Sequence, residues 1–149
     1  MTNERARGGR ALAVVLALAT VAILALVGTT PVEATGRPGT VVVANRADGT
    51  LTLIDVRTDH PTTLALPAGD NPAEPMYLVY SARKVFVGDR ANDRLLVIDP
   101  RHWEVIDEIP AGAGVFHKWA DPTGRQLWVN NDVDNTITVN DPRRHTVVA

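Results

Sequence analysis

The sequence contains no cysteine among its 149 residues. Disulfides, thiolate catalysis and cysteine-based metal sites are therefore excluded. Aromatic residues are also scarce, at 5% of the chain. Beyond the first 34 residues no segment shows the periodicity of an amphipathic helix. The stability of the fold must therefore come from the packing of aliphatic side chains.

Residues 1–34 have the organisation of a signal peptide for export. Arg5, Arg7 and Arg10 precede an apolar run at residues 11–27, and residues 32–34 supply the small side chains of a cleavage site. We expect cleavage after residue 34. An uncleaved membrane anchor at residues 11–27 is the alternative, because about 17 apolar residues are the minimum that spans a bilayer. Either way the protein is expected outside the cytoplasm: periplasmic, at the cell surface or secreted.

The charge of the exported chain is mildly acidic. Without residues 1–34 the 15 basic and 17 acidic side chains fall to 12 and 15, and no run of Lys and Arg remains. Binding to nucleic acid depends on the neutralisation of phosphates by such basic clusters. The sequence therefore predicts no nucleic-acid partner, and it predicts membrane contact only through residues 11–27, if they are retained.

Three stretches of the chain are copies of one pattern, at residues 41–55, 85–99 and 127–141. Each copy holds two runs rich in β-branched and aliphatic residues around a turn, which is Asp-Gly at 48–49, Asn-Asp at 92–93 and Asp-Asn at 134–135. Gly, Asn and Asp are the residues that best accept the left-handed conformation of a hairpin turn. Each copy therefore predicts a β-hairpin.

Further strands are predicted around these hairpins, at residues 62–66, 76–80, 104–109 and 116–120. Four short antiparallel strands repeated about every 43 residues are typical of the blades of a β-propeller. The predicted fold class is all-β: a β-propeller of four-stranded antiparallel blades at residues 41–149, after a short linker at residues 35–40. The pattern predicts three strands in the first blade, four in the second and four in the third, of which the last is incomplete. About three blades are therefore present.

The motifs resemble the repeats of the exported YVTN-type propellers. The resemblance is carried by Val-Val-Ala-Asn at residues 42–45, Ile-Pro-Ala-Gly at 109–112, Asp-Pro-Thr-Gly at 121–124 and Trp-Val-Asn-Asn at 128–131. It implies a non-catalytic binding or interaction scaffold, with a protein or a cell-envelope component as partner and no cofactor. The alternative that it leaves open is part of a periplasmic redox or hydrolytic propeller with a metal or haem cofactor at the central channel.

The strand order of that family implies that the propeller is incomplete. The strand at residues 41–45 is the second of its blade in the family, so the innermost strand of blade 1 is missing. Propellers close with four to eight blades, and each repeat buries its apolar faces only against neighbours. We therefore expect the remaining blades or another subunit to be needed to close the ring.

Two residues break the repeat beside the expected channel. The family has a glycine before its innermost strand where this chain has His117, and the same register places Glu74 in the preceding blade. Imidazole and carboxylate are ligands for Zn, Fe or Cu, so His117 and Glu74 are the candidate metal or cofactor ligands. The alternative is an ordinary pair that lines a loop. Trp119 either lines the channel or fills the wedge between blades, and no catalytic residue is predicted.

Several other polar residues are expected to have structural roles. Each hairpin ends in an aspartate that is predicted to cap the following turn through its own side chain: Asp55, Asp99 and Asp141. Residues 130–135 are rich in Asn and Asp, but they lack the glycine and the final glutamate of a calcium loop, which favours a hairpin turn. His60, His102 and His145 are expected in solvated turns, and Trp128 in the core between blades.

Overall fold

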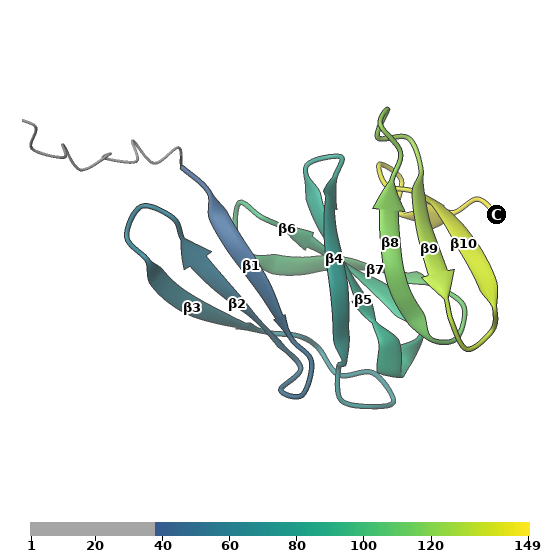
Figure 1. Cartoon of the computed structure of the whole chain (residues 1–149), viewed down its shortest axis with the longest axis horizontal. Coiled ribbons are helices and arrows are strands. Elements are labelled where there is room, and N and C mark those ends of the chain that lie inside the picture. Colours follow the sequence, from purple (N-terminus) through teal and green to yellow (C-terminus); the bar gives the residue numbers. More distant parts are fainter. Residues whose placement is uncertain (1–37) are drawn as a thin grey trace, which may run out of the picture. The chain divides into compact units, whose positions relative to one another are not determined.

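The computed structural model describes residues 38–149 (Figure 1). The predicted signal peptide at residues 1–34, the alternative anchor at residues 11–27 and the first half of the linker at 35–40 lie outside the described residues. Apart from one 3-10 turn at Arg90–Asn92, the described elements are strands. No helix in this part of the chain is long and apolar enough to cross a membrane.

Three antiparallel sheets, here called blades 1, 2 and 3, follow one another along the chain. Blade 1 contains β1 (Thr40–Asn45), β2 (Thr50–Asp55) and β3 (His60–Ala65). Blade 2 contains β4 (Pro75–Ser81), β5 (Lys84–Asp89), β6 (Arg94–Asp99) and β7 (Glu104–Pro110). Blade 3 contains β8 (Val115–Ala120), β9 (Leu127–Asn131), β10 (Thr136–Asp141) and β11 (Thr146–Val147). The predicted fold class, an all-β incomplete propeller, is confirmed.

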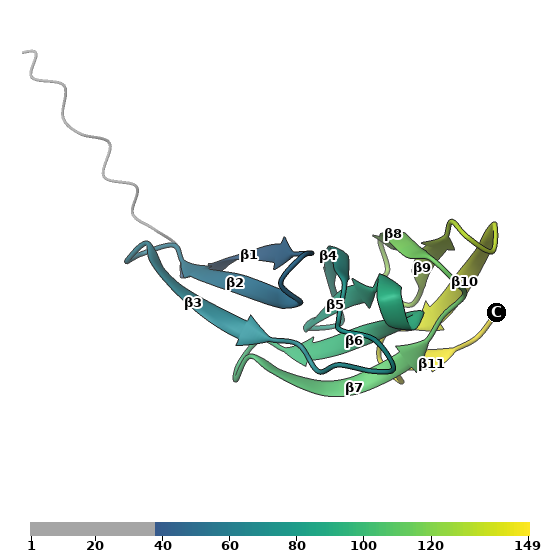
Figure 2. The same ribbon diagram turned by 90° about the horizontal axis from the view of Figure 1, so that it is seen from below.

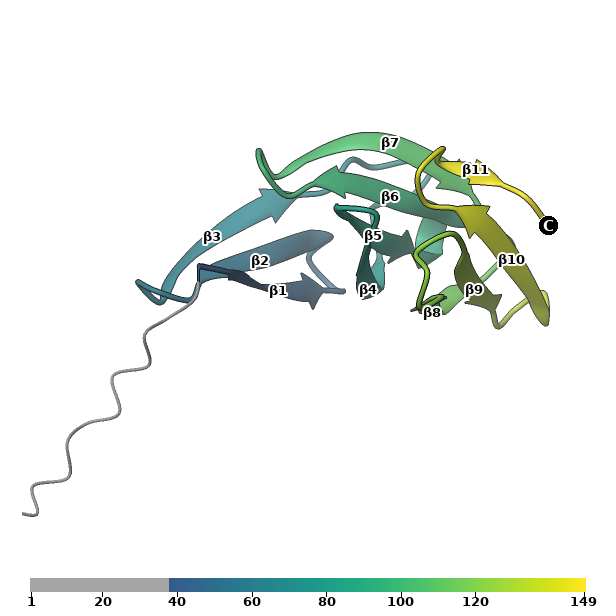
Figure 3. The ribbon, with the colours of Figure 1, turned by 90° about the horizontal axis from the view of Figure 1, so that it is seen from above.

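Within each blade the strands pair in chain order, so the sheet runs from an innermost to an outermost strand. Figures 2 and 3 show β4 and β8 on the same side as β1, with β3, β7 and β11 on the opposite side. The strand β1 carries the repeat residues of β5 and β9 and pairs only with β2. Among the described residues, blade 1 therefore has no counterpart of the innermost strands β4 and β8.

The hairpin turns have the conformation that the repeat predicts. Gly49, Asp93 and Asn135 have φ values of 63°, 50° and 55°, in the left-handed region that Gly, Asn and Asp accept most readily. Each stands at the last position of its turn, before β2, β6 and β10. The three copies therefore form the same local structure, although only one of them contains glycine.

The apolar side chains of blade 2 alternate between its two neighbours. Val85 and Val87 of β5 share a core cluster with Leu51 of blade 1, whereas Phe86 between them shares a cluster with Leu127 of blade 3. Successive side chains of a strand point to opposite faces of the sheet. A blade that is covered on both faces therefore needs consecutive apolar residues in the middle of its strands, as residues 85–87 of β5 and 95–98 of β6 show.

The outer faces of blades 1 and 3 are open in the described part of the chain. Val41 and Val43 of β1 are 49% and 42% exposed, and Trp128 of β9 is 43% exposed. Trp128 occupies the repeat position of Phe86, which in blade 2 faces the next blade. The prediction that Trp128 lies in the core between blades is therefore wrong for the described residues, because no blade packs on that face.

A polar side chain at the end of β1, β5 and β9 holds each hairpin from within. Asn45 donates two hydrogen bonds to threonine hydroxyls of β2, at 3.0 and 2.8 Å, and Asn131 repeats this pattern in blade 3. In blade 2 the fully buried Asp89 takes this place. Its carboxylate accepts a hydrogen bond from Arg94 Nε at 2.9 Å, so blade 2 replaces a neutral contact with a buried ion pair.

Candidate functional site on the innermost strands

Both innermost strands carry a bulge at the same place. The pairing of β4 with β5 shifts between Met76 and Leu78, and the pairing of β8 with β9 shifts between Val115 and Lys118. Tyr77, within the first bulge, has a φ of 40°, which a bulky side chain rarely adopts. Bulges re-aim side chains and are frequent beside functional sites. The bulged segments of β4 and β8 are therefore the candidate functional site.

Three rings from the two strands meet at these bulges. The Tyr77 and His117 rings have centroids 4.3 Å apart, with 39° between their planes. Phe116 lies edge-on to both rings, at 5.1 Å from Tyr77 and 4.5 Å from His117. The Arg90 guanidinium carbon is 5.7 Å from the Phe116 centroid, within the range of a cation–π contact. Blades 2 and 3 are thus joined at this point by ring packing.

Exposed aromatic side chains continue along the same two strands. Tyr80 of β4 is 62% exposed and Trp119 of β8 is 73% exposed. With Tyr77 and Phe116, these strands hold four of the seven Phe, Trp and Tyr residues of the chain. Trp119 therefore lies on the exposed surface of the innermost strands and not in the wedge between blades. In a chain so poor in aromatics, this concentration favours a binding surface.

The structure does not place His117 and Glu74 in equivalent positions. Pro75 pairs with Asp89 and Val115 pairs with Asn131, so His117 corresponds to Tyr77 and not to Glu74. The linker between β7 and β8 is shorter than the linker between β3 and β4. Equivalent residues of β4 and β8 are therefore fewer positions apart in the sequence than equivalent residues of the hairpins. The prediction that aligned His117 with Glu74 used the spacing of the hairpins, and it is wrong for the innermost strands.

Glu74 lies immediately before β4, and its side chain already has a partner. Its carboxylate forms an ion pair with Arg46 of blade 1, and its backbone N–H donates to Asp89 Oδ1 at 2.9 Å. His117, in contrast, contacts the rings of Tyr77 and Phe116. The two candidate ligands thus belong to different contacts, and of the two only His117 has no polar contact among the described residues.

Lys118 is the residue of this site that the sequence reasoning missed. Its ammonium group lies between blades 2 and 3 and donates to the carbonyls of Met76 at 2.9 Å and Phe116 at 2.8 Å. Burial lowers the pKa of Lys118 from 10.5 to about 7. Space for it is made by Gly88, where an added Cβ would lie 2.4 Å from the lysine Nζ. The other copies of the repeat have Ala44 and Asn130 at the position of Gly88. This glycine is the feature of the sequence that could have indicated a buried side chain packed against β5.

The three aspartates that end the hairpins cap their turns, as predicted. Asp55 Oδ1 accepts from the backbone N–H groups of Arg57 and Thr58, and Asp141 does the same two and three residues ahead. The Arg57 N–H is the main cause of a lowered pKa at Asp55. The pKa of Asp99 is also lowered, mainly by the hydrogen bond from the Arg101 guanidinium. These carboxylates are therefore structural and lie in separate blades.

The acidic loop at residues 130–135 is a hairpin turn that binds the preceding blade. Asp132 pairs with Arg90 of blade 2, and Asp134 accepts a hydrogen bond from the backbone N–H of Ala113 at 2.6 Å. In the part of the chain that the structure describes, no group of three His, Cys, Asp or Glu residues is placed to hold a metal ion. The preference for a turn over a calcium loop agrees with these contacts.

One of the turn histidines is not solvated. His145 has a side chain only 17% exposed, and its Nδ1 lies 2.9 Å from Asp107 Oδ2 of β7. Its ring also lies edge-on to Phe86, with centroids 6.2 Å apart. The expectation of a solvated turn is wrong for His145, because this turn folds back onto blade 2. His60 and His102 are exposed as expected.

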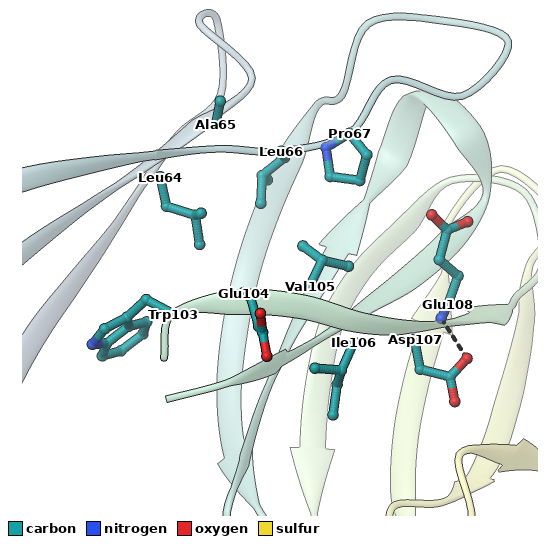
Figure 4. A pocket seen from close by; sticks show the side chains of 10 residues that line it. All are labelled: Leu64, Ala65, Leu66, Pro67, Trp103, Glu104, Val105, Ile106, Asp107 and Glu108. Atoms are coloured by element: carbon teal, nitrogen blue, oxygen red, sulfur yellow. Dashed lines mark hydrogen bonds between the residues drawn. The ribbon is translucent and has the colours of Figure 1, made fainter. Parts of the chain in front are cut away.

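A groove of about 810 Å³ lies between the outer strands of blades 1 and 2 (Figure 4). Leu64 of β3 faces it from one side, with Trp103 and Val105 on the other. Three carboxylates line the rest of that side: Glu104, Asp107 and Glu108. Asp107 is paired with His145, and Glu108 is paired with Arg94. None of the candidate site residues lines the groove, which is separate from the innermost strands.

Comparison with solved structures identifies the class of protein. The chain is similar to hydrazine synthase of Kuenenia stuttgartiensis, with a TM-score of 0.65 and 23% identity over 73% of this chain and 31% of that one. It is also similar to the dihydro-haem d1 dehydrogenase NirN in complex with DHE, with a TM-score of 0.62 and 18% identity over 83% of this chain and 27% of that one. A third similar structure is AztD of Citrobacter koseri, with a TM-score of 0.54 and 16% identity over 74% of this chain and 30% of that one. No protein-family model and no curated protein matches the chain.

These solved structures are β-propeller proteins, so the described residues are propeller blades. The chain spans less than a third of the length of each. At these identities the likeness shows the fold alone, since function in propellers resides in individual sites.

Proposed function

We propose that the chain is part of an exported β-propeller of the YVTN type that acts as a non-catalytic binding scaffold, with a component of the cell envelope as its partner. The observation that carries this proposal is the exposed aromatic surface formed by Tyr77, Tyr80, His117 and Trp119 on the two innermost strands. Aromatic rings supply large contact areas with little conformational entropy to lose, and they are enriched in binding surfaces. The positive φ of Tyr77 supports the proposal, because backbone strain of this kind persists at functional sites.

Co-sedimentation of the purified full chain with isolated cell envelopes tests the scaffold. We expect the chain to sediment with the envelopes, and Trp119→Ala and Tyr77→Ala to weaken this binding several-fold. Val56→Ala is the matched control, because Val56 is 39% exposed but lies in a turn of blade 1. Equal sedimentation of all three variants and the wild type would exclude the innermost strands as the binding surface.

A cofactor at His117 is the second candidate, and the environment of the imidazole favours it. The His117 ring packs at a tilt of 39° against Tyr77, and a flat ligand such as haem packs well against aromatic rings. Haem takes a single histidine as its axial ligand from one side, whereas a metal ion bound through nitrogen and oxygen needs further ligands. Since Glu74 is paired with Arg46, His117 suits haem better than a metal site shared with Glu74.

Titration with haemin separates the two candidates. A cofactor role predicts a shifted Soret band that His117→Ala abolishes and that His102→Ala, a change at an exposed turn histidine, leaves intact. A spectrum identical in wild type and His117→Ala removes the cofactor role and leaves the scaffold.

The open faces of blades 1 and 3 support the proposal that further blades or a second subunit close the ring. Val41, Val43 and Trp128 expose apolar area where blade 2 has buried neighbours on both faces, and each repeat depends on its neighbours for stability. Sedimentation equilibrium of the full chain is expected to show self-association. A monomer with a single cooperative thermal transition contradicts this proposal.

A further inference from the structure

Three arginines of the described residues have no carboxylate within ion-pairing distance: Arg83, Arg125 and Arg143. They lie in the turns β4–β5, β8–β9 and β10–β11, at the upper end of the sheets in Figure 1. This end lies away from the hairpin turns that contain Gly49, Asp93 and Asn135. The arginines of blades 2 and 3 that the fold leaves unpaired therefore gather at one end of the blades.

A hollow of about 720 Å³ lies between two of these turns, where blade 2 meets blade 3. Arg83 and Lys84 line it from β4–β5, and Arg143 and His145 line it from β10–β11, together with Ala82 and Pro142. No carboxylate lines this hollow. Its size is within the range of about 300–1,000 Å³ found for small-molecule sites.

The positive lining continues into two neighbouring hollows. Arg83 and Lys84 also line a second hollow with Arg101, and Arg143 lines a third with Arg125, Arg144 and the carboxylate of Asp141. These residues are dispersed through the sequence as single residues or pairs, so the sequence showed no basic cluster. The folded chain presents one, and the hollow between blades 2 and 3 lies at its centre.

The nearby carboxylates leave two charges of this hollow, those of Arg83 and Arg143, without a partner. Asp99 lies 3.8 Å from Lys84, but its carboxylate is held more closely by Arg101. Asp107 is bound to His145, and Asp141 to Arg144. Each of these carboxylates has a partner other than Arg83 and Arg143, so the two guanidinium groups remain available to a ligand.

The backbone is strained where it presents Arg83. Ala82 and Arg83 form the two-residue turn of the β4–β5 hairpin, with φ values of 47° and 63°. Such turns favour Asn-Gly, because both positions need a left-handed backbone that other residues avoid. An arginine held in this conformation at the edge of a hollow is the kind of strained residue that occurs at ligand-binding sites.

We propose that the hollow between the β4–β5 and β10–β11 turns binds a phosphate group of a small soluble molecule, with inorganic phosphate as the simplest example. The planar guanidinium groups of Arg83 and Arg143 match the geometry of phosphate oxygens and form paired, charge-assisted hydrogen bonds. Lys84 adds a compact third positive group, which Asp99 compensates in part from 3.8 Å. This site is distinct from the aromatic surface of the innermost strands and does not depend on the role proposed for that surface.

Calorimetric titration of the full chain with sodium phosphate, at constant ionic strength, tests the site. We expect saturable binding of phosphate and none of nitrate, which carries a single charge. Arg83→Gln and Arg143→Gln should each weaken phosphate binding by about tenfold or more, since each removes charge-assisted hydrogen bonds. Arg57→Gln is the matched control, because Arg57 lies in the corresponding end turn of blade 1 and is paired with Asp55.

Arg83→Lys distinguishes a direct loss of phosphate binding from a loss caused by misfolding. It keeps the positive charge but removes the planar, paired donors of the guanidinium group. It should therefore bind phosphate more weakly than wild type and more tightly than Arg83→Gln, with an unchanged circular dichroism spectrum. Equal phosphate affinity in Arg83→Gln and Arg57→Gln overturns the proposal, and so does binding of nitrate as strongly as phosphate. Binding to phosphatidylglycerol vesicles without binding of inorganic phosphate also overturns it, in favour of a membrane surface.

Discussion

The buried amine of Lys118 makes the most direct prediction from this structure. The lysine Nζ is held by the carbonyls of Met76 and Phe116, and no carboxylate of the described residues pairs with it. Burial penalises the ammonium form, which lowers its pKa to about 7. At pH 7 about half of the Lys118 amines are then uncharged, against roughly one in 3,000 for an ordinary lysine.

The shift has a consequence for stability whose sign follows from proton binding. Between pH 7 and pH 10 the unfolded chain holds a proton on Lys118 that the folded chain has partly or wholly released. The free energy of unfolding therefore rises with pH in this window, and the penalty is complete below pH 7. A fall in pKa from 10.5 to about 7 makes the whole effect roughly 5 kcal/mol, of which about 2 kcal/mol is recovered between pH 7 and pH 9.

Two measurements on the full chain test this reasoning. The chain has only two lysines, Lys84 and Lys118, so NMR of lysine labelled at Cε gives two titration curves, assigned with a Lys84→Met variant. Urea unfolding at pH 7 and pH 9, compared with Lys118→Met, should show the gain of about 2 kcal/mol in the wild type alone. A Lys118 signal that titrates above pH 9.5, or parallel unfolding curves for the two proteins, refutes the burial argument.

Three further predictions concern packing and ion pairs. Gly88→Ala places a Cβ against the buried lysine amine and should lower the free energy of urea unfolding by about 1–3 kcal/mol; an unchanged midpoint contradicts the close packing. Asp89→Asn removes the buried carboxylate of Arg94 and leaves the guanidinium paired with Glu108 alone, so it should cost about 1–3 kcal/mol in thermal or urea unfolding, whereas a loss below about 1 kcal/mol would mean that the pair is not desolvated. His145 holds the pKa of Asp107 below its usual value, so His145→Asn should raise that pKa in a carboxyl NMR titration, and the stabilisation by the wild-type pair should fade as pH drops through the Asp107 pKa.

The hairpins and the blades could be predicted from the sequence because they obey local rules. Gly49, Asp93 and Asn135 accept the left-handed turn conformation wherever they stand. Asp55 and Asp141 cap turns with backbone groups two or three residues away. Because such contacts repeat with the sequence, three copies of the pattern predicted three sheets with the observed numbers of strands.

The candidate site depended on contacts between blades, which sequence spacing does not determine. The register of His117 against blade 2 follows the length of the β7–β8 linker and the bulges in β4 and β8. A one-residue bulge changes which side chain faces the neighbour. The hairpin repeat could therefore place His117 on an innermost strand, but it paired the residue with Glu74 instead of Tyr77.

By itself the sequence determined the class of fold, since period, turn residues and alternation of apolar side chains are properties of neighbours along the chain. Only the tertiary structure decided which side chains are buried or gathered. It placed Lys118 over Gly88, turned His145 onto blade 2, and brought Arg83 beside Arg143 from another blade. The physical reason is that burial and electrostatic potential are sums over all atoms nearby in space, and in a propeller those atoms come from the next blade.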